Sequence, residues 1–347
     1  MRGWLRWPLL SLGWLSAAAC SPTYLLQAAH GQLQLMYKRK SIEKVLADPD
    51  TDSAVRTRLM QVRAAREFAS DALGLPRNRS YRSYADIGRD YVVWNVVAAP
   101  EFSVQPRTWC FPFTGCVAYR GYFREARARA YAEHLRAQGD DVLVGGVTAY
   151  STLGHFADPV LNTMLGYGEL QLVGTMFHEL AHQLVYVKGD STFNESFAMT
   201  VEQEGVARWL HAQGRDAELA GYLARWEAQL ASAQFLMKGR NQLAALYREP
   251  LPDAEKRARK QQQLGALAAQ LLSEERERGL RSGYAVWAEQ GLNNAHLASV
   301  ATYFDCIPAF RALLAQQQGD LPAFYARVRQ LAQQSPAARR GFCAVRP

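Results

Sequence analysis

The sequence predicts an α+β fold, in which a small mixed sheet lies beside one histidine-bearing helix and a largely helical lobe follows. Residues 90–99, 116–122 and 141–152 are rich in β-branched and aromatic side chains, which favour strands. Residues 170–186 instead carry apolar side chains at helical intervals. From residue 215 onward nearly every segment shares that helical spacing, and Pro and Gly mark the breaks.

Residues 1–19 have the pattern of a secretory signal peptide, with a basic start, an apolar segment over residues 7–15 and a run of small residues. The apolar segment is too short to cross a membrane. Because the small-residue run ends at Cys20, it resembles a bacterial lipobox, although Ala17 stands where leucine is usual. Cys20 would then be the lipidated first residue of a periplasm-facing envelope protein anchored to a membrane, with the outer membrane favoured. Cleavage near Ala19 without a lipid is the alternative.

The composition is that of an ordinary globular protein. Of the 347 residues, 49% are hydrophobic and 21% are charged, so the chain can bury a substantial core. The formal net charge of +8 comes from dispersed Lys and Arg. No dense basic block with interleaved aromatic residues occurs, so we expect no nucleic-acid partner.

The cysteines agree with an oxidising compartment. Beyond Cys20 there are four, an even number that indicates disulfides in an exported chain and allows three connectivities. We favour a local bridge between Cys110 and Cys116, because the turn-rich sequence Phe-Pro-Phe-Thr-Gly separates them. A metal site is disfavoured because no Cys-x-x-Cys spacing occurs. The other two cysteines are Cys306 and Cys343.

The most informative stretch is His-Glu-Leu-Ala-His over residues 178–182, inside the predicted helix 170–186. His178 and His182 are one helical turn apart, so both imidazoles can bind one metal ion, and the apolar stripe of the helix falls on nearly the opposite face. Glu179 between them is placed to act as a general base. This is the H-E-x-x-H arrangement of zinc hydrolases, so Zn²⁺ is the expected cofactor. Two exposed histidines on a surface helix are the alternative interpretation.

A catalytic zinc ion needs a third protein ligand and an open fourth position. The predicted helix 194–210 begins with Asn-Glu, and Glu195 on its first turn is the favoured third ligand. Glu202 lies two turns further along the same face. We expect Glu202 to hold an imidazole N–H, or to be the ligand itself if Glu195 is not.

The segments before and after these helices supply the remaining candidates. Residues 102–109 are expected to form a further extended segment, and residues 147–152 are a candidate edge strand that binds an extended peptide. Hydrolysis of a peptide also needs a donor for the oxyanion. The candidates are Tyr150, His155 and Tyr303, and Asn293 and Asn294 are polar residues that could reach the cleft.

The two motifs, His178–His182 and Asn194-Glu-Ser-Phe-Ala198, resemble those of the gluzincin metallopeptidases. Five further blocks are distinctive: 27–35, 91–96, 109–123, 149–154 and 293–298. With the two motifs, they resemble the bacterial predicted-aminopeptidase lipoprotein family. This resemblance implies zinc on His178, His182 and Glu195, with Glu179 as base, and a peptide or protein substrate. The order of the elements, a small sheet followed by the H-E-x-x-H helix, separately indicates a zincin-like catalytic core over residues 20–212 with a helical N-terminal segment, and a helical lobe over 213–347 packed on it.

The sequence departs from well-known gluzincins at two points. Only twelve residues separate His182 from Glu195, and Met199 stands where an orienting Asp is usual. Glu202 or a backbone carbonyl would then take that role. No Gly-x-Met-Glu-Asn motif is present to bind a substrate ammonium. An endopeptidase that processes envelope proteins, and a non-catalytic lipoprotein scaffold containing a metal, therefore remain as alternatives to an aminopeptidase.

Overall fold

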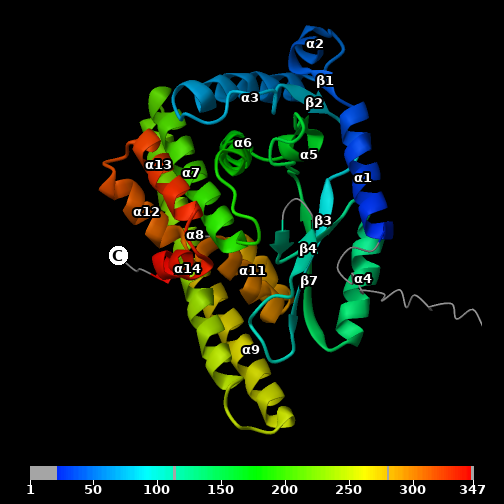
Figure 1. Ribbon diagram of the computed structural model, residues 1–347, viewed down its shortest axis with the longest axis vertical. Coiled ribbons are helices and arrows are strands. Elements are labelled where there is room, and N and C mark those ends of the chain that lie inside the picture. Colours follow the sequence, from blue (N-terminus) through cyan, green and yellow to red (C-terminus); the bar gives the residue numbers. More distant parts are fainter. Residues whose placement is uncertain (1–21, 112–114, 280, 345–347) are drawn as a thin grey trace, which may run out of the picture.

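The computed structural model describes residues 22–111, 115–279 and 281–344, and it has the predicted α+β composition (Figure 1). The predicted signal peptide and Cys20 lie outside the described residues. The elements, in chain order, are α1 (Pro22–Tyr37), β1 (Lys40–Ser41), α2 (Ile42–Ala47), α3 (Ser53–Asp71), β2 (Ser83–Ala85), β3 (Val93–Pro100), β4 (Trp109–Phe111), β5 (Gly115–Val117), β6 (Arg120–Tyr122), α4 (Glu125–Ala137), β7 (Asp140–Val147), β8 (Val160–Leu161), α5 (Asn162–Leu165), α6 (Glu169–Leu184), α7 (Ser191–Ala212), α8 (Asp216–Leu246), α9 (Asp253–Glu277), α10 (Gly283–Gln290), α11 (Asn294–Phe304), α12 (Ile307–Gln316), α13 (Leu321–Ala332) and α14 (Pro336–Ala344).

The strands form three small sheets instead of the single mixed sheet that the sequence predicts. The largest has the order β6-β3-β7 and is entirely antiparallel, with Trp94 of β3 opposite both Tyr122 and Gly146. Helix α4 covers one face of this sheet, where Ala128, Ala132 and Leu135 pack in one cluster with side chains of β3 and β7. A parallel pair occurs only between β2 and β8 among the described strands.

Two predicted extended segments are wrong. Residues 102–108 form no strand, because the chain turns at Pro100, where Ser103 N–H donates to its carbonyl (3.0 Å), and Arg107 forms an ion pair with the buried Asp140. The candidate edge strand over residues 147–152 ends at Val147. Beyond it the chain folds around Asp158, whose carboxylate accepts hydrogen bonds from the backbone N–H and the hydroxyl of Thr152 (3.0 and 2.7 Å).

One apolar core and one disulfide connect distant parts of the chain. One apolar cluster joins α3, α6 and α7 with α12 and α13, so its side chains come from both sides of residue 212. The structure contains the disulfides Cys110–Cys116, across the β4–β5 hairpin, and Cys306–Cys343, which ties α14 to the start of α12. The helical stretch 294–316 is long and apolar enough to cross a membrane by length and composition. However, 61% of its most apolar 18-residue segment is buried inside the protein, as in the core helix of a globular fold.

Candidate metal centre

Helices α6 and α7 lie side by side and carry the candidate ligands (Figure 1). Close packing is possible because glycines stand at the contact. A Cβ on Gly205 of α7 would lie 2.7 Å from the Phe177 ring of α6, and one on Gly174 of α6 would lie 3.1 Å from the Glu202 carboxylate. The missing side chains therefore let Glu202 reach across to α6.

The turn between the two helices is tight because Asn194 closes it. The Asn194 side-chain amide accepts a hydrogen bond from Val187 N–H and donates one to the Val187 carbonyl, both at 2.8 Å. Asp190 caps α7 by accepting from Phe193 N–H (3.3 Å). Arg339 of α14 donates to the other Asp190 oxygen (2.7 Å). These contacts allow Glu195 to face the histidines although the connection is short.

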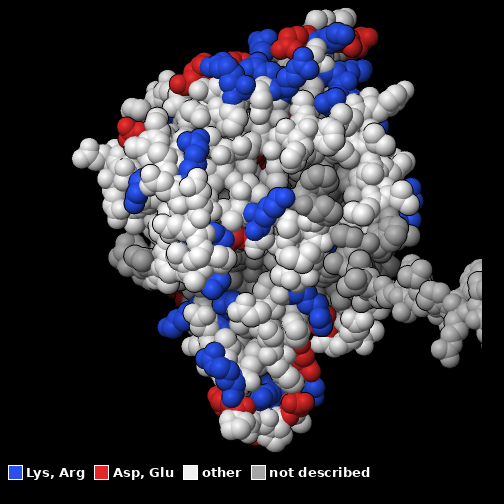
Figure 2. Space-filling view, in the orientation of Figure 1, with Lys and Arg blue, Asp and Glu red and all other residues white. Residues whose placement is uncertain are grey.

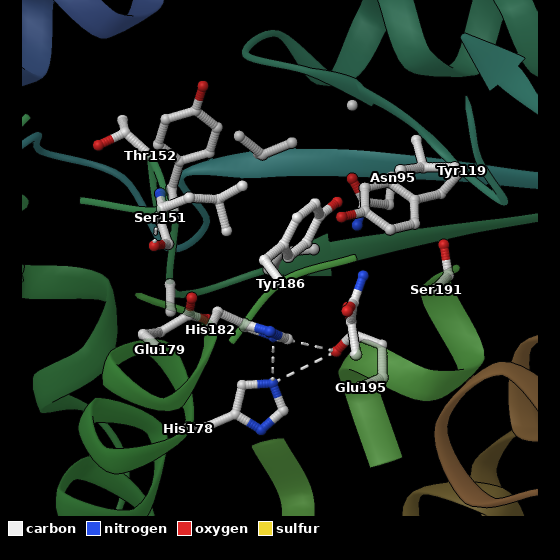
Figure 3. Close-up of a pocket in the computed structure, with 18 of the residues that line it drawn as sticks. Asn95, Tyr119, Ser151, Thr152, His178, Glu179, His182, Tyr186, Ser191 and Glu195 are labelled. Atoms are coloured by element: carbon white, nitrogen blue, oxygen red, sulfur yellow. Dashed lines mark hydrogen bonds and ion pairs between the residues drawn. The ribbon is translucent and has the colours of Figure 1, made fainter. Parts of the chain in front are cut away.

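Three donor atoms converge between α6 and α7 (Figure 3). Nε2 of His178 lies 3.1 Å from Nε2 of His182 and 3.3 Å from Oε2 of Glu195, and the His182–Glu195 separation is 3.6 Å. Donors about 2.0–2.1 Å from a tetrahedral ion lie roughly 3.3 Å apart, so these separations fit one Zn²⁺-sized ion. Two imidazoles and one carboxylate also form a common catalytic zinc donor set.

Glu202 contacts the His178 ring at Nδ1, on the side opposite the Nε2 atom that faces His182 and Glu195. Its Oε2 lies 3.0 Å from Nδ1 of His178, so a proton on Nδ1 can be donated to the carboxylate and Nε2 is left to bind a metal. His182 lacks such a contact, since its buried Nδ1 has no hydrogen-bond partner among the described residues. The geometry thus gives Glu195 and Glu202 different roles.

The charges at this centre are strongly coupled. Burial opposes ionisation of Glu195, but the two imidazoles outweigh it and hold the pKa of Glu195 well below its usual range. Burial likewise opposes a proton on His178, and hydrogen bonds to Glu195 and Glu202 raise its pKa well above the ordinary value. The two carboxylates that favour a proton on His178 would also favour a divalent cation beside it.

Glu179 has a different environment. Burial raises the pKa of its carboxyl, and the neighbouring His178 and His182 oppose the rise. Glu179 lines the same cavity as the three candidate ligands, and it is not one of the converging donor atoms. A carboxylate so placed can accept a proton from a molecule in the cavity.

Of the predicted oxyanion donors, Tyr303 is the one on whose pKa the candidate ligand Glu195 acts most strongly. The Glu195 carboxylate raises the pKa of Tyr303 well above the ordinary value, and burial adds to the rise. Tyr150 lines the cavity too, but burial and then Asp158, not Glu195, raise its pKa. His155 also lines the cavity. Asn294 does not; its side chain bonds Tyr247 and the carbonyls of residues 100 and 101.

Two tyrosines at the centre were not predicted from the sequence. Burial and then the Glu195 carboxylate raise the pKa of Tyr119 well above its ordinary value and that of Tyr186 to about 12. Figure 3 shows both side chains above Glu195, turned toward one another. The predicted helix 170–186 offered a signal for Tyr186, because it would place this residue one turn after His182. In the structure α6 ends at Leu184, and the ring centres of His182 and Tyr186 lie 6.2 Å apart. Tyr119 has no such local signal.

The centre opens into a cavity of about 1040 Å³. Its walls come from α1, from the face of the β6-β3-β7 sheet, from residues 147–156 and from α6 and α7. Apart from the polar groups at the metal centre, much of the lining is apolar or aromatic, with Leu25, Phe111, Phe123 and Phe156 among it. A cavity of this size and lining can hold several residues of a peptide.

Fold and site together define an α+β protein with a candidate metal centre of two histidines and a glutamate in a large cleft. The family described as "Putative aminopeptidase" has a model that matches residues 23–342, and the chain belongs to this family. Comparison with curated proteins and with solved structures found no match.

Proposed function

We propose that the protein is a zinc-dependent peptide hydrolase that acts as an aminopeptidase. The observation that carries this proposal is the convergence of His178, His182 and Glu195 with mutual separations that suit a tetrahedral ion. The three residues would hold the metal, and no fourth protein ligand belongs to the group among the described residues. When bound, Zn²⁺ supplies a Lewis acid that polarises a carbonyl and lowers the pKa of water. The zincin-like core is part of the same proposal.

The chain's own residues supply the remaining steps. Glu179 accepts a proton from water at the cleft side of α6 and passes it to the departing amine, a role that its raised pKa suits. Tyr303 is the first candidate to donate a hydrogen bond to the oxyanion, because it stays protonated beside Glu195. Among the described strands β7 pairs only with β3, so its other edge near Val147 offers backbone groups to an extended peptide.

The test compares the wild-type chain with Glu179→Gln. We expect the variant to keep its bound zinc, measured by elemental analysis, and to lose peptide hydrolysis by about a hundredfold or more. Glu204→Gln, on α7 and bonded to Arg208 outside the centre, is the matched control and should keep both. Full activity of Glu179→Gln would contradict the mechanism, as would a wild-type chain that binds no metal. A wild-type chain that binds zinc and hydrolyses no peptide would favour the scaffold alternative.

An endopeptidase is the second candidate, because the cavity offers no separate carboxylate for a substrate ammonium. Among the described residues that line it, the only acidic ones are Glu179, Glu195 and Glu202, all at the metal centre. Comparison of free with N-acetylated peptides separates the two functions. An aminopeptidase should cleave only the free peptides, and an endopeptidase should cleave both.

We place this activity in the bacterial cell envelope, facing the periplasm. Two disulfides support an oxidising compartment. The N-terminal pattern ending at Cys20 supports a lipid anchor, most simply in the outer membrane. Metabolic labelling with a radioactive fatty acid should mark the wild-type chain and leave Cys20→Ser unlabelled.

A further inference from the structure

Helix α1 exposes an unusual amount of apolar surface. Seven large apolar side chains are exposed among the described residues, and four of them are on this one helix: Leu25, Leu26, Leu33 and Tyr37. The helix also contains no Asp, Glu, Lys or Arg in its 16 residues. Scattered exposed leucines are normal, but a concentration of this kind on one helix marks an interaction surface.

Three of these four side chains form one stripe along α1, which we call the outer face; Leu25 is turned toward the cavity. Leu26, Leu33 and Tyr37 follow each other at seven and four residues, so they lie within about 40° of one another around the helix. They are 69%, 67% and 94% exposed. His30 is on the same stripe and is hydrogen-bonded to Gln34 (2.9 Å). No described residue covers this face.

The opposite side holds α1 to the body of the protein. The Gln27 amide donates to the Gly121 carbonyl (3.3 Å) and accepts from Phe123 N–H (3.2 Å). Gly31 allows the Phe123 ring to pack directly on the helix, since a Cβ there would lie 2.2 Å from it. Tyr24 stacks on Phe111, with ring centres 5.3 Å apart. The outer face therefore belongs to a fixed helix and not to a loose tail.

We propose that the outer face of α1 docks on the surface of a lipid bilayer. Cys20, the predicted site of the lipid anchor, is two residues before the first residue of the helix. Lys38 and Lys40 are exposed directly beyond its other end, where they can meet anionic headgroups. A 16-residue helix is about 24 Å long, which suits a helix lying in the interface and not one crossing it.

The surroundings in the structure agree with this orientation. Figure 1 shows α1 along the outer edge of the molecule, next to α4 and away from the α8–α9 pair. In Figure 2 the part of that flank not covered by grey residues carries few charges, and Lys and Arg, with some Asp and Glu among them, gather at the end of the molecule where α2 and α3 lie. An apolar flank bordered by basic side chains matches an anionic membrane surface.

Docking would bring the cleft next to the membrane. One face of α1 forms a wall of the cleft, through Tyr24, Leu25, Ala28 and Gln32. The outer face of the same helix would lie on the bilayer. Phe156, which also lines the cavity, is 48% exposed and adds to the apolar surface there. Substrates held at the bilayer surface would then meet the cleft directly. This docking does not depend on what the cleft hydrolyses.

Spin labels on the full chain test the orientation. In the chain that carries its lipid on Cys20, whose thiol is thereby blocked, Leu33→Cys and Leu26→Cys are labelled in turn, with Val286→Cys on α10 as the matched exposed apolar control. On phosphatidylethanolamine–phosphatidylglycerol vesicles, the lipid retains the chain in every case, so the label reports how the body lies. We expect the α1 labels to lose access to an aqueous nickel quencher and to gain access to oxygen, and the Val286→Cys label to stay accessible to nickel.

Two results would overturn the proposal. Labels at residues 26 and 33 that are as accessible to nickel as the control would show that the outer face stays in water. Spin–spin coupling between labels on two copies, growing with protein concentration in the absence of vesicles, would assign the face to a second copy of the chain. Unchanged thermal unfolding of each variant confirms that the labelled chains are folded.

Discussion

The Glu202 carboxylate lies 3.0 Å from Nδ1 of His178, on the side of the ring opposite Glu195. We expect Glu202→Ala to weaken zinc binding by about 10–100-fold, because outer partners of this kind fix the ligand ring. Glu195→Ala should weaken it much further. Competition with a chromophoric chelator measures both, and Glu204→Ala is the control. Equal losses for Glu195→Ala and Glu202→Ala would mean that the two carboxylates share one role.

The glycine contact between α6 and α7 gives a prediction for stability. Gly205→Ala places a methyl group 2.7 Å from the Phe177 ring and 2.9 Å from a Leu73 methyl, so overpacking should lower the free energy of unfolding by about 1–3 kcal/mol. Urea unfolding measures this loss. Gly265→Ala in α9 meets nothing within 4 Å and should leave stability unchanged or raise it. Similar effects at both positions would rule out a steric cause.

His296 gives a prediction for pH. Burial lowers its pKa to about 4 from an ordinary 6.5, and its Nδ1 accepts from Asn293 N–H. As pH falls from 6.5 to 4, the unfolded chain takes up a proton that the folded chain refuses, so the free energy of unfolding should fall by about 3 kcal/mol. Above pH 6.5 this residue should have no effect.

The control for His296 is His296→Gln, which can keep the capping contact and does not titrate. Urea unfolding at several pH values should show a smaller loss between pH 6.5 and 4 in this variant than in the wild-type chain. Parallel curves for the two chains would contradict the assignment.

The disulfide Cys306–Cys343 should contribute more to stability than Cys110–Cys116. It closes a loop with a sequence separation of 37, compared with 6 for the other. On loop length alone, replacing both members of the longer bridge with alanine should cost about 3–4 kcal/mol and the shorter about 2 kcal/mol. Unfolding in urea of the two double variants gives the comparison, and a reversed order would show that loop closure does not set their effects.

Much of the helical framework could be predicted from local patterns. Helix α6 was expected over residues 170–186 and spans Glu169–Leu184, because its apolar stripe packs in the core. The α+β class followed in the same way. The end of β7 could not be predicted, since it depends on Asp158 binding Thr152 across a folded segment. Strand composition over residues 141–152 carries no information about that contact.

The same distinction between local pattern and tertiary contact applies to the candidate site. Spacing alone brought His178 and His182 to one face of one helix. Which carboxylate faces Nε2 and which faces Nδ1 depends on the distance and rotation between α6 and α7, which Gly174 and Gly205 set. Tyr119 lies between β5 and β6, far from Glu195 in the sequence, so its place at the centre follows only from tertiary packing.

The ion pair between Arg339 and Asp190 connects α14 with the candidate metal centre. Arg339 is on α14, and Asp190 caps the helix that carries Glu195. This contact is made only when α14 has docked on α7, and the disulfide Cys306–Cys343 holds α14 in place. A chain without α14 would therefore hold the candidate ligand Glu195 less firmly. A chain ending at residue 335 should accordingly bind zinc more weakly than the full chain in a chelator competition.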